Sequence, residues 1–187
     1  MKSLFFAFLF MFNAAIVPAV HAEKADSTKP TVVDADQMAY DDVKQVNTFT
    51  GAVVVTRGTL LMKAARVVVV QDPAGYQFAT LYAEPGSLAS FRQKRDGGTD
   101  LWIEGEAERI EYDGRTELVK LFSKAKMRRL NGKTPTDEVE GEFISYDSRS
   151  EFFSVNNTPA GQDSKAGAGR IKAVIQPRVP GTADTSK

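Results

Sequence analysis

The chain has 187 residues, enough for a single domain, and 42% of them are hydrophobic. Acidic and basic side chains number 24 each. This balance argues against a role in wrapping nucleic acid, because such proteins carry a surplus of Lys and Arg that neutralises phosphates. The absence of cysteine excludes disulfides, thiolate nucleophiles and cysteine-bound metals.

Residues 1–22 have the pattern of a secretory signal peptide. Lys2 precedes an apolar run that ends near Val17, and Val20-His21-Ala22 provides a cleavage site. The run is short for a membrane-spanning helix, which needs about 20 apolar residues, so an uncleaved anchor is the less favoured alternative. Cleavage after Ala22 would also remove the sole histidine. We therefore expect an exported chain without Ser-His-Asp catalysis or the usual zinc sites.

Short stretches rich in Val, Phe, Tyr and Thr follow from about residue 30 to residue 155. In segments such as 47–56 and 66–70, β-branched residues are too dense for good helices. Turn signals made of Gly, Asp, Asn and Pro separate these stretches and leave little room for helices. The sequence therefore predicts an almost entirely β fold.

One unit recurs: a small residue, a charged one, then alternating apolar positions. It begins at Ala35, Ala65, Ala107 and Gly141, at spacings of 30, 42 and 34 residues, which favours stacked β-hairpin layers over a strict solenoid. Period-two alternation predicts one dry face, formed by Met38 and Tyr40, Val68 and Val70, Ile110 and Tyr112, and Ile144 and Tyr146. The opposite face is polar. We expect two sheets that close on each other as a sandwich, a jelly roll or an open groove.

Two motifs suggest enzyme chemistry but have simpler explanations. Gly132-Lys133-Thr134 resembles the end of a phosphate-binding loop, but Met127 stands where that loop needs glycine, so a hairpin turn is favoured. Glu104, Glu106 and Glu108 alternate along one strand and point the same way. Glycoside cleavage needs two carboxyls that face each other, so a solvated sheet face is favoured here.

Charge is also divided between two neighbouring segments. Residues 115–133 carry seven bases and one acid, whereas residues 134–151 carry six acids and one base. The favoured interpretation is two adjacent strands that attract each other. The alternative is a basic surface for phosphate-bearing ligands or an acidic partner.

The dry face permits two interpretations. It is either an ordinary filled core or a groove wide enough for acyl chains, since burying each methylene contributes about 0.8 kcal/mol. Both use the same residues, so the sequence leaves the choice open. Residues 156–187 are mainly small and polar and are expected to be disordered, apart from Ile171–Ile175, which is either a last strand or a transient contact.

The segment NTFTGAVVVTRGTL at 47–60, preceded by Ala35-Asp36-Gln37, resembles the OstA-like family of periplasmic lipopolysaccharide-transport proteins. Residues 104–112 and 139–146 resemble later repeats of that family. The resemblance covers residues 30 to 155. It implies an open, slightly twisted β-jelly roll of stacked antiparallel strands in residues 23–155, between the signal peptide and the tail.

The resemblance also implies a non-enzymatic function, without cofactor, metal or catalytic residue. The two sheets would hold the acyl chains of lipopolysaccharide. Copies would join edge strand to edge strand, near residues 30–33 and 152–155, into a periplasmic bridge. That bridge would run from an inner-membrane lipopolysaccharide export complex to an outer-membrane lipopolysaccharide translocon.

The resemblance implies a set of lipid-facing side chains: Val33, Met38, Tyr40, Val53, Val55, Met62, Val70, Phe91, Ile110, Tyr112 and Ile144. Arg92, Lys94 and Arg95 are candidates for contacts with the phosphates. Three rival hypotheses remain: an assembly module of the same fold with a filled core, an inner-membrane-anchored relay protein of this fold, and a β-solenoid enzyme that acts on polysaccharides.

Overall fold

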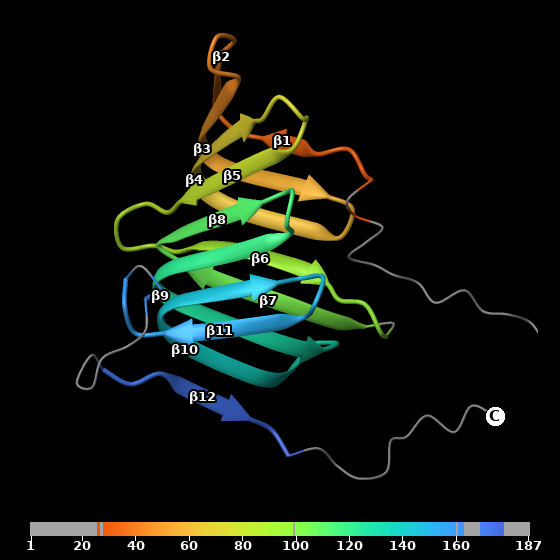
Figure 1. Ribbon diagram of the computed structural model, residues 1–187, viewed down its shortest axis with the longest axis vertical. Coiled ribbons are helices and arrows are strands. Elements are labelled where there is room, and N and C mark those ends of the chain that lie inside the picture. The colour runs from red at the N-terminus through yellow and green to blue at the C-terminus, as the bar shows by residue number, and fades with distance from the viewer. Residues whose placement is uncertain (1–25, 27, 99, 160, 163–168, 178–187) are drawn as a thin grey trace, which may run out of the picture.

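The computed structural model describes residues 26, 28–98, 100–159, 161–162 and 169–177. In these residues the elements are twelve β-strands whose ladders are all antiparallel (Figure 1), which confirms the predicted fold class. The strands are β1 (Val32–Asp34), β2 (Gln37–Asp41), β3 (Val46–Arg57), β4 (Leu60–Gln71), β5 (Gln77–Tyr82), β6 (Ala89–Lys94), β7 (Leu101–Ala107), β8 (Arg109–Asp113), β9 (Leu118–Asn131), β10 (Thr134–Asp147), β11 (Phe152–Asn156) and β12 (Lys172–Ile175). The expected signal peptide lies outside the described residues.

Four long strands, β3, β4, β9 and β10, bend and contribute to two sheet faces, which we call the first and second walls. The first wall contains β2, the start of β3, the end of β4, β5, β8, the start of β9, the end of β10 and β11. The second wall contains β1, the other halves of the long strands, β6, β7 and β12. In Figure 1 the strands stack from β1 and β2 at one end to β12 at the other.

The walls meet at a corner where the backbone turns sharply. Gly51 and Ala52 in β3 have φ angles of 86° and 42°, and Ser123 and Lys124 in β9 have φ angles of 62° and 53°. The ladders shift register beside these residues. Glycine adopts the left-handed conformation without steric cost, as at Gly51, whereas Ala52, Ser123 and Lys124 adopt it despite the steric cost of a Cβ.

The recurring sequence unit marks this corner. Ala107 is fully buried where β7 ends, and the amide of Glu108 donates to the carbonyl of Ser123 across a 3.1 Å N···O distance. Ala89 and Ala125, also buried, keep the neighbouring strands close. Glu108, the charged member of this repeat, therefore lies where the chain passes from one wall to the other.

The pairing registers place two rows of side chains inside the first wall. One row runs through Met38, Phe49, Val67, Leu81, Ile110, Leu121, Ile144 and Val155. The other runs through Tyr40, Asn47, Val69, Ala79, Tyr112, Val119, Tyr146 and Phe153. Directly paired residues point to the same face, so both rows face the interior. Six of the eight residues predicted for the dry face lie in these rows.

The prediction that Val68 and Val70 lie on the dry interior face was wrong. Val67 is 1% exposed and Val69 packs against the core, whereas Val70 is 39% exposed on the outer face. Ala64 pairs with Val53 at the corner, so the repeat in β4 begins at Ala64 and not at Ala65. Four consecutive valines show no alternation, and a shift of one residue exchanges the two faces of a strand.

The expected hairpin turn at Gly132 was confirmed, and the structure selects one of the two alternatives for the run at 171–175. Gly132, with a φ of 61°, lies in the hairpin turn between β9 and β10, where Asn131 pairs with Thr134. The short run near residue 172 forms β12 and pairs with β10. Within the described residues we find no helix long and apolar enough to cross a membrane, and no cluster of three potential metal ligands.

Candidate functional site

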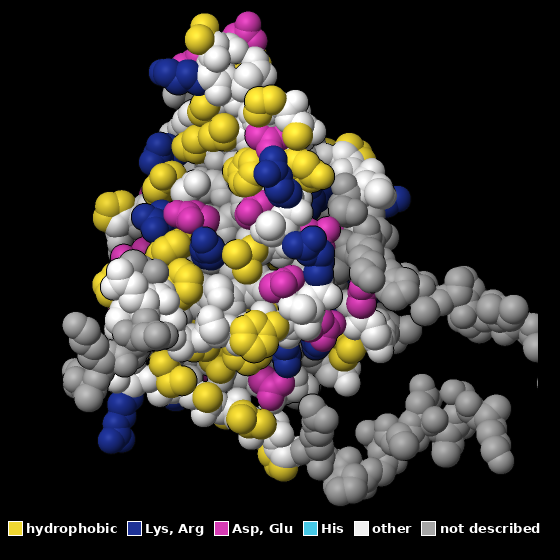
Figure 2. Space-filling model, in the orientation of Figure 1, with side chains coloured by type: hydrophobic (Ala, Val, Ile, Leu, Met, Phe, Trp, Pro, Cys, Tyr) yellow, Lys and Arg dark blue, Asp and Glu magenta, His cyan; other side chains and the backbone are white. Residues whose placement is uncertain are grey.

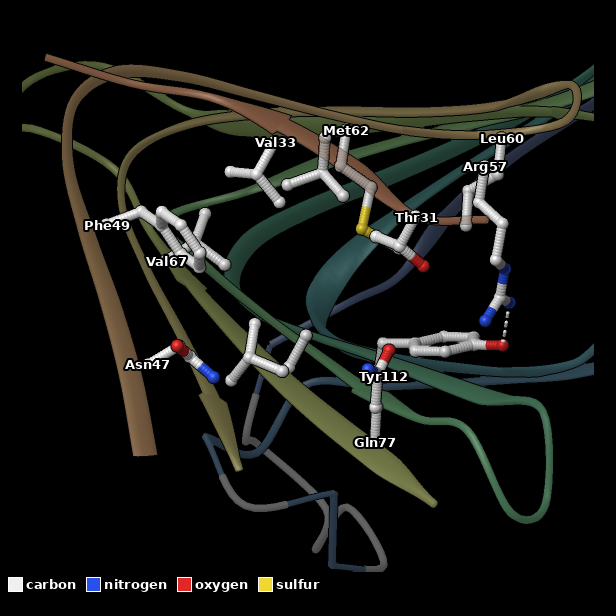
Figure 3. Close-up of a pocket in the computed structure, with 13 residues that line it drawn as sticks. Thr31, Val33, Asn47, Phe49, Arg57, Leu60, Met62, Val67, Gln77 and Tyr112 are labelled. Carbon is white, nitrogen blue, oxygen red and sulfur yellow. Dashed lines mark hydrogen bonds between the residues drawn. The ribbon is translucent and has the colours of Figure 1, made fainter. Parts of the chain in front are cut away.

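An apolar cavity of about 210 Å³ lies between the two walls near the N-terminal end of the stack. Figure 3 shows the side chains that converge on it. The second wall contributes Val33, Val55, Leu60 and Met62, and the first wall contributes Phe49, Val67, Val69, Ala79 and Tyr112. We call this cavity, together with β1, β2 and the start of β3, the open end.

Polar side chains lie only around the rim of the cavity. Thr31, Asn47 and Gln77 are among the lining residues. The Nη2 of Arg57, at the end of β3, donates a hydrogen bond to the Tyr112 hydroxyl at a distance of 2.5 Å (Figure 3). This bond joins the second wall to the first on the side away from the corner. An apolar interior with a few oriented polar groups at its mouth is typical of a pocket that binds a small apolar or amphipathic molecule.

Side-chain exposure changes sharply along the interior rows. Met38 and Tyr40 are 61% and 50% exposed at the open end, although their strand register directs them to the interior. Further along the same rows, Ile110 and Ile144 are fully buried and Tyr146 is 1% exposed. The interior is thus accessible at one end and solvent-free farther on.

The part of the interior bounded by β6 to β11, which we call the filled half, is packed by its own side chains. Ile103 of β7 and Leu121 of β9 are fully buried. Phe91 lies so close to Gly105 that a Cβ on that glycine would stand 2.2 Å from the Phe91 Cε1. Close packing of this kind leaves no space for a fatty chain unless the walls separate.

Polar contacts also join the walls over the filled half. Arg95, just after β6, forms an ion pair with Glu151 in the β10–β11 turn. Arg129 of β9 donates to the Glu151 carbonyl at 2.8 Å, and its guanidinium lies 5.0 Å from the centre of the Phe153 ring. These contacts close the side of the filled half that faces away from the corner.

The structure divides the eleven predicted lipid-facing residues into four groups. Val33, Val55, Met62 and Tyr112 line the cavity; Met38 and Tyr40 extend the interior rows beyond it; Val53, Phe91, Ile110 and Ile144 are buried in the core; and Val70 lies on the outer face. Only the first two groups are accessible to a ligand in this conformation. Whether any of them contacts lipid stays a prediction.

Sequence reasoning missed much of the cavity lining. Phe49, Val67 and Val69 were not among the candidates, yet all three line the cavity. Aligning the second repeat at Ala64 would have identified both valines, because they then match Ile110 and Tyr112. Phe49 was identifiable too, because it has the same parity along β3 as Val53 and Val55, so period-two alternation alone places all three on the interior face.

The basic residues proposed for phosphate contact lie away from the cavity. Arg92 forms an ion pair with Glu104 at 2.5 Å, and both Arg92 and Lys94 lie over the Trp102 ring on the outer face. Figure 2 shows Lys and Arg interspersed with Asp and Glu on the face in view. Their positions do not support a role at the mouth of the cavity.

Residues 115–133 and 134–151, which carry opposite charges, lie on adjacent strands that attract each other, as favoured from the sequence. β9 and β10 form one long antiparallel pair, and the Lys126 Nζ lies 3.0 Å from a Glu138 oxygen and 3.1 Å from a Glu140 oxygen. The hydrogen bond to Glu138 raises the pKa of Lys126, and the hydrogen bond from Lys126 lowers the pKa of Glu140. These pairs neutralise the outer face of the filled half.

Comparisons with known proteins agree on one family. The sequence model described as LptA/(LptD N-terminal domain) LPS transport protein matches residues 32–152. The lipopolysaccharide export system protein LptA of Haemophilus influenzae is 27% identical over 156 residues, which cover 83% of this chain and 82% of that protein. The protein of the same name in Escherichia coli K12 is 32% identical over 126 residues, covering 67% of this chain and 66% of that protein.

A solved structure has the same architecture. It is the crystal structure of LptH, described as the LptA homologous periplasmic component of the conserved lipopolysaccharide transport device from Pseudomonas aeruginosa. Its TM-score is 0.69 and its sequence identity 27%, and the match covers 81% of this chain and 99% of that one. The fold is therefore shared over nearly the whole of that structure.

Proposed function

Because this chain belongs to the LptA/LptD N-terminal domain family of LPS transport proteins, we propose that it is a non-enzymatic carrier that binds the acyl chains of lipopolysaccharide between its two walls. The observation that carries this proposal is the apolar cavity at the open end, in a chain whose relatives are named as lipopolysaccharide export proteins. The sugars and phosphates would stay in water at the mouth while the acyl chains are buried.

The size of the cavity supports partial entry of one chain. An apolar cavity of about 150 Å³ holds benzene, so about 210 Å³ accommodates the end of one acyl chain. Each buried methylene contributes about 0.8 kcal/mol, which provides the affinity without any catalytic chemistry. Deeper entry requires the walls of the filled half to separate, and it would break the contacts of Arg95 and Arg129.

We further propose that copies join end to end to form a periplasmic bridge between an inner-membrane export complex and an outer-membrane translocon. The stack ends in β1 and β2 on one side and in β11 and β12 on the other. Terminal strands carry unpaired backbone groups that bind another strand readily. The periplasmic location is supported by the expected signal peptide and by the similarity to LptH of Pseudomonas aeruginosa, which is described as a periplasmic component.

The close packing of the filled half supports one alternative function, an assembly module whose core is filled. A module that only assembles, with a core closed to lipid, would show the packing seen around Phe91 and Gly105 along its whole length. The cavity at the open end argues against this alternative. Lipid capture at that end decides between the two functions.

Two adjacent valines provide the test. A photo-crosslinking amino acid at Val69, which lines the cavity, should capture lipopolysaccharide in living cells. The same group at Val70, which is more exposed but lies on the outer face, is the matched control and should not. Equal capture at both positions would contradict the cavity as the binding site, and absence of capture at Val69 in a secreted, folded protein would favour the assembly module.

A further inference from the structure

Arg57 differs from the other arginines that join the walls. Its guanidinium crosses the mouth of the cavity and binds the Tyr112 hydroxyl, with its Cζ 5.3 Å from the centre of the ring (Figure 3). By contrast, Arg95 forms an ion pair with the carboxylate of Glu151, and Arg129 donates a hydrogen bond to the backbone carbonyl of the same residue. Within the described residues, no ion pair links Arg57 to an acid.

The nearest turn does not supply the missing anion. Asp26 is buried against the hairpin that follows Arg57, but its carboxylate accepts hydrogen bonds from the Thr59 amide and hydroxyl at 2.8 and 2.6 Å. It also accepts one from Gln93 at 3.2 Å. This carboxylate is committed to holding the hairpin in place.

Arg57 therefore has unused binding capacity. A guanidinium has five N–H donors, and its Nε is shielded from solvent without an acceptor in the described part of the chain. Arg95 and Arg129 also have a buried Nε without a hydrogen-bond acceptor, but their guanidinium groups contact an acid or a carbonyl elsewhere, and the Arg109 Nε lies 3.3 Å from a Glu111 oxygen. Arg57 is half-buried and its contacts in the described part of the chain are the neutral hydroxyl and ring of Tyr112, so an anion at the mouth would gain a charge-assisted hydrogen-bond partner there.

The geometry fits an amphiphile with a phosphate head. The planar guanidinium fork matches phosphate oxygens and binds them in a bidentate manner. A tail that starts at Arg57 can enter the cavity toward Met62 and Val67, both of which line it. The cation and the apolar surface thus lie next to each other, so a single amphiphile can contact both, the cation with its phosphate and the apolar surface with its tail.

We propose that Arg57 is the head-group anchor of the open end: it binds the phosphate of a phosphate-bearing amphiphile, and the Tyr112 hydroxyl holds it in place until the phosphate replaces that hydroxyl. This inference rests on the proposed function, since it assigns the tail to the same cavity. Replacement of the Tyr112 contact also breaks the one hydrogen bond described between the walls at the mouth, so binding of the head group loosens the entrance for the tail.

The test compares two amphiphiles with the same tail, dodecyl phosphate and dodecyl maltoside, binding to the purified exported protein. The wild type should bind the phosphate about tenfold more tightly, the size expected for hydrogen bonds to a charged group. Arg57→Gln should remove that preference and leave maltoside binding within about twofold. Arg92→Gln, on the outer face, is the matched control and should behave as the wild type.

Two further variants separate anchoring from folding. Tyr112→Phe keeps the ring and removes the hydroxyl, so it should bind dodecyl phosphate at least as tightly as the wild type. Arg57→Lys keeps the charge and should retain a preference for the phosphate even if Arg57→Gln fails to fold. Thermal unfolding of each variant provides the folding control.

Three results would overturn the proposal: equal affinity of the wild type for both amphiphiles, equal weakening of both by Arg57→Gln, or competition by inorganic phosphate as strong as by dodecyl phosphate. The last would identify a site for free anions. If neither amphiphile binds the wild type, the cavity itself is not a lipid site, and the proposed function fails together with the anchor. Binding of both amphiphiles with equal affinity rejects the anchor alone.

Discussion

The open end and the filled half are built from the same rows of residues but differ in what those residues do. Met38 and Ile110 belong to one interior row, yet Met38 is 61% exposed and Ile110 is fully buried. β2 has a neighbour on one side only, whereas β8 lies between β5 and β9. Direction toward the interior therefore does not ensure burial, which requires flanking strands and a facing wall.

The comparison assigns different energetic roles to the two regions. Close packing in the filled half stabilises the chain and excludes ligand, while the open end leaves apolar surface that can be buried by a partner. A protein that must take up and release a fatty chain benefits from having both regions. Four experiments break or sharpen this distinction.

The largest expected effect on stability comes from shortening the side chain at two positions of the same interior row. Ile110→Ala in the filled half should lower the free energy of unfolding by about 2–5 kcal/mol, because it removes buried methyl groups and leaves a cavity. Met38→Ala at the open end should change it by no more than about 0.5 kcal/mol. Urea unfolding measures both. Similar losses would show that the open end is packed in solution as tightly as the filled half.

The next effect comes from adding volume. Gly105→Ala should cost about 1–3 kcal/mol, because the new Cβ would lie 2.2 Å from Phe91 and 2.9 Å from Leu121. Shortening the facing ring in the double variant Gly105→Ala/Phe91→Leu should restore part of that loss.

Ala79→Phe is the counterpart of Gly105→Ala at the open end, where the added ring has the cavity to occupy. It should change stability by less than about 1 kcal/mol yet block binding of lipopolysaccharide. Calorimetry measures stability, and a labelled-lipopolysaccharide assay measures binding. Unchanged lipid binding by a folded Ala79→Phe variant would place the ligand elsewhere.

The smallest effect concerns pH and the outer face of the filled half. The hydrogen bond from Lys126 lowers the pKa of Glu140 in the folded chain, so this contribution to stability is present above the unfolded pKa and is lost as pH falls through the folded pKa. Glu140 is partly exposed and screened, so Glu140→Gln should cost less than about 1 kcal/mol near pH 7. Unfolding curves of both proteins should converge as pH falls below the lowered folded pKa of Glu140; a difference that persists after Glu140 is protonated would point to a contact independent of charge.

Some features of the fold follow from neighbouring residues and were predictable. Dense β-branched residues and frequent turn signals predicted strands, and the opposite charges of residues 115–133 and 134–151 predicted the pairing of β9 with β10. The segment at 47–60 indicated the family through its residues alone. The prediction of which side chains in Val67–Val70 face the interior failed, because a run of identical residues carries no information about the two faces of a strand. Pairing with β3 and β5 decided the register.

The sequence by itself determined that this chain forms β-strands with one apolar face, because alternation and turn chemistry depend on residues close together in the chain. Only the tertiary structure decided which part of that face encloses a cavity and which part is filled. The volume between the walls depends on side chains from strands far apart in sequence, such as Phe91 beside Gly105. The same holds for the contact of Arg57 with Tyr112, which lie 55 residues apart and meet only when the two walls face each other.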